Sequence, residues 1–127
     1  MSSNSQAPVF DPETLEQLLD LVDGDDTSFL SDLFQSYVQT ATESLSTLRG
    51  PANDDLMRRA AHTLKGSSLN VGAVAVASVC RQLEADLRQN RVADLPDRLA
   101  RLEAQVQRVV ETYPETIATL QARAIAS

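Results

Sequence analysis

His62 is the residue whose type and surroundings offer the clearest chemistry in this sequence. It is the only histidine of the chain. Residues 56–83 around it hold no acidic side chain and four basic ones: Arg58, Arg59, Lys65 and Arg81. An imidazole is largely neutral near pH 7 and can act as a nucleophile, while neighbouring cations can neutralise an anion attached to it. The sequence therefore predicts a histidine that handles an anionic group.

The spacing of apolar residues predicts which way His62 faces. At about 100° per residue, one narrow arc of residues 56–71 is expected to face the core. This arc contains Leu56, Ala60, Leu64, Ser67 and Val71, with Met57 beside it. His62 falls far from the arc, so we expect the ring to stand outward on the basic face of its helix.

Four neighbours share that outward face, and each has an expected role. Lys65 is placed to neutralise an anion carried by the ring, and Arg58 adds positive potential. Gly66, four residues after His62, leaves space above the imidazole because helical side chains lean toward the N-terminus. A glycine inside a helix costs roughly 1 kcal/mol relative to alanine. Leu69 offers an apolar contact for a docking partner.

Other catalytic chemistries lack the groups that they need. The sequence has no nucleophile elbow, no glycine-rich phosphate loop and no second histidine. Ser67 is expected in the core, and metal catalysis requires three or more ligands. Cys80 is the only cysteine, which excludes an internal disulfide and Cys-rich zinc sites. What remains is His62 as a nucleophile that itself receives a group.

Charge and hydropathy limit which partners and which cellular compartment we expect. The net charge of −7 argues against general nucleic-acid binding. Residues 1–50 hold nine acidic side chains against Arg49 alone, which is either a solubility device or a means of steering basic partners. No apolar run approaches the roughly 20 residues that span a bilayer, and the first residues lack the features of a secretory signal. We therefore expect a cytoplasmic protein with no nucleic-acid or membrane partner.

The helices that position these groups are predicted by the helical periodicity after residue 10. The expected helices cover about residues 11–23, 26–50, 53–71, 73–90 and 94–113. Asp11 and Asn53 are expected N-caps. The first three helices should end at Gly24, Gly50-Pro51 and Gly72.

Pro114 is expected to break or kink the last long helix. Ile117 and Leu120 would then lie in a short terminal helix.

Four long amphipathic helices with short connections predict an all-α fold, an up-down antiparallel four-helix bundle, with one short extra helix before it. Residues 1–9 read as a disordered tail. Residues 10–127 read as one domain, because a chain of 127 residues cannot form a second independent core. A closed bundle with charged outer faces favours a monomer.

One series of motifs resembles the histidine-containing phosphotransfer (Hpt) domain of two-component phosphorelays. It consists of Arg59-Ala-Ala-His-Thr-Leu-Lys-Gly-Ser-Ser68, Val71-Gly-Ala73 and Cys80-Arg-Gln-Leu-Glu84. The family pattern has an Ala-His-x-Leu-Lys-Gly-Ser core, a Gly-(Ala/Leu) pair six residues after that glycine, and often Cys-x-x-Leu-Glu on the next helix. Phe29-Leu-Ser-Asp-Leu-Phe34 also looks like the second helix of the family. The resemblance covers about residues 10–111.

The resemblance implies a phosphorelay intermediate. His62 Nε2 would accept a phosphoryl group from a receiver-domain aspartate, or from a kinase, and pass it to another receiver. Lys65 would help to neutralise the phosphate, and Gly66 would give the receiver access. The chain would need no cofactor, since the receiver brings the Mg²⁺, and without an ATP site it would not phosphorylate itself.

Further expectations concern the neighbours and partners of the ring. Glu84 and Arg88 occupy positions where relatives often place polar groups near the imidazole, and Cys80 matches a buried cysteine of the family. The partners would be response-regulator receiver domains and a (hybrid) sensor histidine kinase. They would dock over Arg58 and Leu69.

Three alternatives stay open at the sequence level. The same bundle could be an adaptor that docks receivers without moving phosphate. It could be a phosphohistidine phosphatase or another hydrolase, although no second catalytic group supports this. It could also be a module of a larger sensor kinase, whereas Met1 and the lack of linker sequence favour a free-standing protein.

Overall fold

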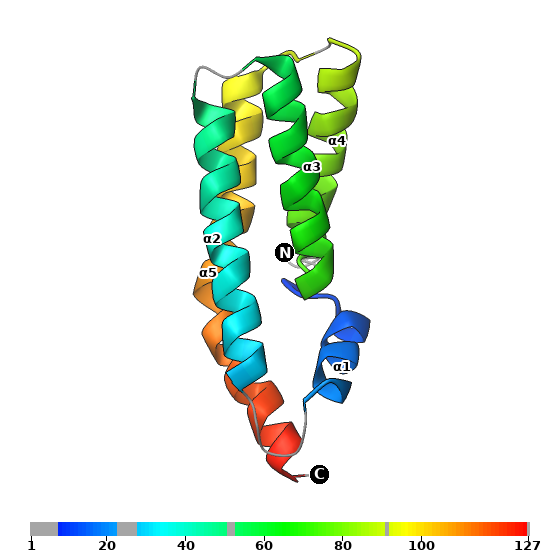
Figure 1. Cartoon of the computed structure of the whole chain (residues 1–127), viewed down its shortest axis with the longest axis vertical. Coiled ribbons are helices and arrows are strands. Elements are labelled where there is room, and N and C mark those ends of the chain that lie inside the picture. The colour runs from blue at the N-terminus through cyan, green and yellow to red at the C-terminus, as the bar shows by residue number, and fades with distance from the viewer. Residues whose placement is uncertain (1–7, 23–27, 51–52, 91, 127) are drawn as a thin grey trace, which may run out of the picture.

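The structure of the chain consists of helices joined by short connections (Figure 1). The computed structural model describes residues 8–22, 28–50, 53–90 and 92–126. The described residues form five helices and no strand: α1 (Pro12–Asp20), α2 (Ser28–Arg49), α3 (Asp54–Val71), α4 (Val74–Arg88) and α5 (Leu95–Ala126). The all-α expectation is therefore confirmed.

The four long helices form the predicted up-down bundle. In Figure 1, α2 and α5 lie side by side, α3 and α4 form the other half, and successive long helices run in opposite directions. α3 packs closely against both α2 and α4, and α5 contacts α2 and α4. The short α1 lies below α3 and α4, beside the lower part of α5. In the described parts of the chain, no helix has both the length and the apolar character to cross a membrane.

The two predicted N-caps are present. One carboxylate oxygen of Asp11 accepts two hydrogen bonds from Thr14. The backbone N–H of Thr14 donates at 3.2 Å and the hydroxyl of Thr14 at 2.9 Å. The Asn53 side-chain oxygen accepts from the Leu56 backbone N–H at 2.9 Å. These bonds satisfy N–H groups that have no partner within the helix. They explain why α1 begins at Pro12 and α3 at Asp54.

Gly72 ends α3, as its position predicts, and also joins α3 to α1. Its φ of 78° is left-handed, which a glycine adopts without steric cost. Its carbonyl accepts a hydrogen bond from the Asp11 backbone N–H at 2.8 Å. A Cβ at this position would lie 3.0 Å from the Thr14 side chain. Glycine is thus required twice here, for the turn and for the close approach of α1.

Several expectations concern residues outside the described part of the chain. The expected tail includes residues 1–7, and the stops at Gly24 and Pro51 also lie outside the described residues. The same is true of the expected start of the second helix near residue 26.

The expected break at Pro114 is wrong. α5 continues through Pro114 to Ala126 as one helix of 32 residues. A proline inside a helix costs about 3 kcal/mol, because it lacks an N–H and crowds the preceding turn. Ile117 and Leu120 beyond it are both buried in the core. Burying each such side chain contributes about 1.5–3 kcal/mol, so the two together offset the cost of the proline.

The core is aliphatic, as the composition indicates. Its fully buried large side chains come from all four long helices and include Leu30, Phe34, Leu48, Leu64, Val71, Val76, Leu83, Leu102, Val109 and Leu120. Phe34 stacks on Tyr113 and meets the ring of Phe10 edge-on. These three rings pack residues before α1 against α2 and α5.

The predicted core face of α3 is rotated from the true one. Leu56 is 46% exposed and Ser67 is only partly buried, whereas Ala61 and Ser68 are fully buried. The rotation arises because α3 packs against α4 as well as α2. Ser68 tolerates this burial because its hydroxyl hydrogen-bonds the Tyr37 hydroxyl at 2.8 Å.

Candidate functional site

His62 stands on the outer surface of the bundle, in the middle of α3. Its side chain is 66% exposed, as the helical spacing predicts despite the error in the core face. α4 runs antiparallel to α3 and packs beside it, on one side of His62 (Figure 1). An exposed imidazole held on a long helix is accessible to another protein and is fixed in position by the bundle.

Glu84 of α4 binds the ring of His62 and the side chain of Lys65 at the same time. One carboxylate oxygen, Oε2, lies 2.8 Å from His62 Nδ1. The other, Oε1, accepts a hydrogen bond from Lys65 Nζ at 2.8 Å. Arg88, one turn further along α4, donates to Oε2 at 3.3 Å. A single carboxylate thus organises three cationic or ionisable groups from two helices.

The burial of Glu84 makes these contacts strong. Its side chain is only 7% exposed, while Lys65 is 23% exposed. Burial raises the pKa of the Glu84 carboxyl, but the hydrogen bonds from Lys65 and His62 lower it further, and the net pKa lies below its ordinary value. Glu84 is therefore ionised at neutral pH.

An ionised Glu84 determines the tautomer of the ring. A carboxylate can only accept, so Nδ1 must carry the proton that lies between the two groups. In a neutral imidazole the other nitrogen, Nε2, then has a free lone pair. Among the described residues, no side chain hydrogen-bonds Nε2. The site therefore presents a nucleophilic nitrogen at the exposed end of the ring.

The comparisons with known proteins bear on this geometry. The family model named Hpt domain matches residues 11–112, most of the chain. The chain belongs to the Hpt family. Hpt domains are histidine phosphotransfer carriers, so the resemblance carried by residues 59–84 is confirmed.

Two solved structures share the Hpt fold of this chain. Histidine-containing phosphotransfer protein B (HptB) from Pseudomonas aeruginosa PAO1 matches with a TM-score of 0.75 and 24% identity, over 90% of this chain and 98% of that one. A histidine-containing phosphotransfer protein from rice matches with a TM-score of 0.68 and 23% identity, over 91% and 84% of the two chains. A comparison with curated proteins found no match.

Gly66 lies in open space on this Hpt surface. A Cβ built at Gly66 meets no atom within 4 Å. Close helix packing therefore does not explain the glycine, whose cost to helix stability is about 1 kcal/mol relative to alanine. The clearance that it leaves one turn from His62 is on the outside of the bundle, where a partner would approach.

The remaining site residues are less directly connected to the ring. Arg58 donates to Asp55 at 2.6 Å, so its charge is shared with a carboxylate on its own helix. Leu69 is 43% exposed on the outer face of α3. Whether these two residues contact a partner stays a prediction.

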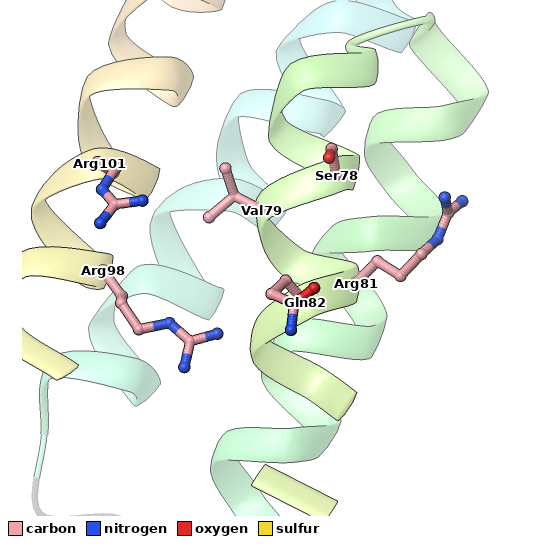
Figure 2. Close-up of a pocket in the computed structure, with 6 residues that line it drawn as sticks. All are labelled: Ser78, Val79, Arg81, Gln82, Arg98 and Arg101. Atoms are coloured by element: carbon pink, nitrogen blue, oxygen red, sulfur yellow. The ribbon is translucent and has the colours of Figure 1, made fainter. Parts of the chain in front are cut away.

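A second polar feature lies on the other side of α4. A groove of about 350 Å³ between α4 and α5 is lined by Ser78, Val79, Arg81, Gln82, Arg98 and Arg101. Figure 2 shows Arg98 and Arg101 reaching from α5 toward α4, while Arg81 extends to the opposite side of α4. Arg98 forms an ion pair with Asp86 at 2.8 Å. This ion pair bridges the two helices and makes no contact with His62.

Two buried protic groups lie inside the bundle near the site. Burial raises the pKa of the Tyr37 hydroxyl and of the Cys80 thiol to about 12. The Cys80 side chain is fully buried, in agreement with the buried cysteine implied by the resemblance. Both groups are neutral at physiological pH and leave Glu84 as the anion of this region. Among the described residues, no group of three or more His, Cys, Asp or Glu side chains gathers as metal ligands would.

The link between Glu84 and Lys65 is the part of the site that sequence reasoning missed. The sequence does hold one signal for it. Glu84 follows Leu83 and precedes Leu87 on the buried face of α4, together with Ala77 and Cys80. A carboxylate on an apolar stripe is rarely buried unless it is paired, so its position predicts a cationic partner on the neighbouring helix.

Proposed function

We propose that this Hpt protein is a phosphorelay intermediate whose phosphoryl carrier is Nε2 of His62. The observation that carries the proposal is the 2.8 Å contact between Glu84 and His62 Nδ1. In the neutral ring it leaves the lone pair on the exposed nitrogen, Nε2, which points away from the carboxylate. Nε2 attacks the phosphorus of an aspartyl phosphate in a receiver domain, and the aspartate carboxylate leaves with the electron pair of the broken P–O bond.

Lys65 supports the transferred group while it stays bound to Glu84. An ammonium group has three N–H donors, and one of them serves Oε1 of Glu84. The other two are available for phosphate oxygens. Phosphoryl transfer depends mainly on alignment and charge neutralisation, and this half-buried cation supplies both beside the ring.

The partners in this proposal are receiver domains of response regulators and a sensor histidine kinase. The receiver contributes the aspartate and the Mg²⁺, while this chain contributes the nucleophile and the cation. The protein itself has no kinase activity in this scheme. We also propose that it acts as a cytoplasmic monomer, with Leu69 and Arg58 at the edge of the docking surface.

The test is transfer in both directions with a receiver domain. A receiver loaded with radioactive phosphate should transfer label to the wild-type chain, and the labelled chain should transfer it to a second receiver. His62→Gln should abolish labelling while it preserves the helical circular dichroism spectrum. If the variant still docks receivers and supports output without label, the chain acts as an adaptor and the proposal is wrong.

A further inference from the structure

A phosphoryl group on Nε2 changes the ring that Glu84 faces. When Nε2 forms a bond to phosphorus and Nδ1 keeps its proton, the ring becomes a cation. The Glu84 carboxylate already lies 2.8 Å from Nδ1 and is ionised. We propose that Glu84 is a positioning residue which keeps the Nδ1 proton on phosphorylated His62, so that the phosphoryl group leaves from a neutral imidazole. This inference rests on the proposed function and extends it from the accepting step to the donating step.

The electron count shows why this proton matters. In the donating step, an acceptor oxygen forms a bond to phosphorus, and the Nε2–P bond breaks with its electron pair returning to Nε2. If Nδ1 carries a proton, the leaving group is neutral imidazole. If Nδ1 has lost its proton, the leaving group is an imidazolate anion, which is much more basic and leaves slowly. With Glu84 in place, the ring neither gains nor loses a proton in either step.

The geometry allows Glu84 to serve the ring without releasing Lys65. The two carboxylate oxygens are divided, with Lys65 on Oε1 and His62 on Oε2. A phosphate that draws on the free N–H donors of Lys65 therefore does not compete with Nδ1 for the same oxygen. Arg88 shares Oε2 at 3.3 Å, but its side chain is largely exposed and its contact is the longest of the three. Water screens such an exposed pair.

The other charges near the ring act against retention of the proton. On α3, Lys65 shares Glu84 with the ring, and Arg58 is paired with Asp55 of its own helix. On α4 the cations are Arg88 and Arg81, which lies one turn before Glu84. These cations favour loss of a proton from a cationic ring. Glu84 is thus the group on these two helices that holds it.

The remaining elements contribute no second anion. Cys80 of α4 and Tyr37 of α2 are buried and neutral at physiological pH. Toward α5, Asp86 is paired with Arg98 on the opposite side of α4. In the described part of the chain, the only carboxylate in contact with His62 is that of Glu84.

The experiment follows loss of phosphate from the isolated protein. The full chain is phosphorylated with phosphoramidate, and one added phosphoryl group is verified by intact-mass spectrometry. After the donor is removed, the decay of the phosphohistidine signal is followed by ³¹P NMR from pH 6 to pH 9. Wild type is compared with Glu84→Gln, which keeps a hydrogen-bond acceptor without the charge, and with Glu84→Asp, which keeps the charge.

We expect the Glu84→Gln variant to lose phosphate more slowly than wild type as the pH rises. The ratio of the two rates should be close to one at pH 6 and reach roughly thirtyfold at pH 8, since an imidazole of ordinary pKa, about 6.5, keeps its second proton in only about 3% of molecules there. The Glu84→Asp variant should recover much of the wild-type profile. Lys65→Ala is the control for loss of the ammonium group. It keeps Glu84 and removes a cation that opposes the Nδ1 proton, so its rate should not fall away from that of wild type as the pH rises.

Two results would overturn the inference. One is a Glu84→Gln profile that runs parallel to that of wild type across this range. The other comes from ¹⁵N NMR of the phosphorylated wild-type ring, which needs no variant: loss of the Nδ1 proton below pH 8 contradicts the proposal. Failure of wild type to accept phosphate at His62 is a different result, because it rejects the proposed function itself.

Discussion

Glu84 divides its two carboxylate oxygens between His62 and Lys65, and this division assigns the residues different tasks. The oxygen on Nδ1 fixes the orientation and tautomer of the ring. The oxygen on Nζ holds a cation beside it. A carboxylate that is 7% exposed holds both groups more firmly than a solvated one, because water competes less for its lone pairs. The local chemistry therefore depends on one buried acid as much as on the histidine.

Lys65→Ala should slow phosphoryl transfer while His62 stays in place. The variant removes the ammonium that neutralises the phosphate but leaves the Glu84 contact with Nδ1. Loss of one preorganised donor typically costs about 100- to 1000-fold in rate, and we expect a fall in the transfer rate of about 100-fold. Stopped-flow transfer from a phosphorylated receiver measures this rate. Lys65→Arg, which keeps the charge, should lose less, and equal rates for all three proteins would rule out the neutralising role.

Gly66→Gln should block access to the ring without harming the fold. A side chain at residue 66 meets no atom of the protein within 4 Å of its Cβ, so the helix accommodates it. It fills the space through which a receiver approaches His62. We expect receiver-dependent transfer to fall at least tenfold while labelling by the small donor phosphoramidate persists. If the variant transfers phosphate to and from receivers at the wild-type rate, the clearance has no function.

The helices show which sequence signals determine an element and which do not. The side-chain caps of α1 and α3 and the glycine stop of α3 follow from local chemistry, and all three were predictable. The path of α5 through Pro114 was not, because the burial of Ile117 and Leu120 depends on neighbours that the local sequence does not specify. The choice of Ser68 over Ser67 for the core depends in the same way on α4 and on the hydroxyl of Tyr37.

Alanine substitutions at Gly66, inside α3, and at Gly72, its C-cap, should change the free energy of unfolding in opposite directions. Gly72→Ala places a side chain at φ 78° and 3.0 Å from Thr14, which should destabilise the protein by about 1–3 kcal/mol. Gly66→Ala meets no neighbour and should stabilise it by about 1 kcal/mol. Urea unfolding followed by circular dichroism gives both values. A Gly72→Ala protein as stable as wild type would contradict the account of the junction between α1 and α3.

At the scale of the whole molecule, the bundle brings the site together. His62 and Lys65 lie on α3, and Glu84 and Arg88 lie on α4, about twenty residues later along the chain. The antiparallel packing of α3 against α4 places them side by side. The sequence indicates an outward histidine and an up-down bundle, but the relative register of two helices depends on the packing of the complete core. The shared carboxylate could therefore not be derived from the periodicity of either helix alone.

The same cluster should make stability sensitive to acid. The pKa of Glu84 is lower in the folded protein than in the unfolded chain. The stabilisation that its ionised form provides is present above the ordinary carboxyl pKa and is lost as the pH falls through the lower, folded value. Glu84→Gln should cost about 1.5–3 kcal/mol at pH 7, typical of hydrogen bonds to a charged group, and less at pH 3. Urea unfolding at both pH values measures the difference, and an equal cost at both would show that Glu84 contributes no charge-dependent stability.

One measurement tests, without any partner, whether His62 carries the phosphoryl group. Wild type and His62→Gln are exposed to phosphoramidate and examined by intact-mass spectrometry before and after mild acid. We predict one acid-labile phosphoryl group on wild type and none on the variant, which has the same fold. An unmodified wild-type protein, or equal labelling of the variant, would contradict the account.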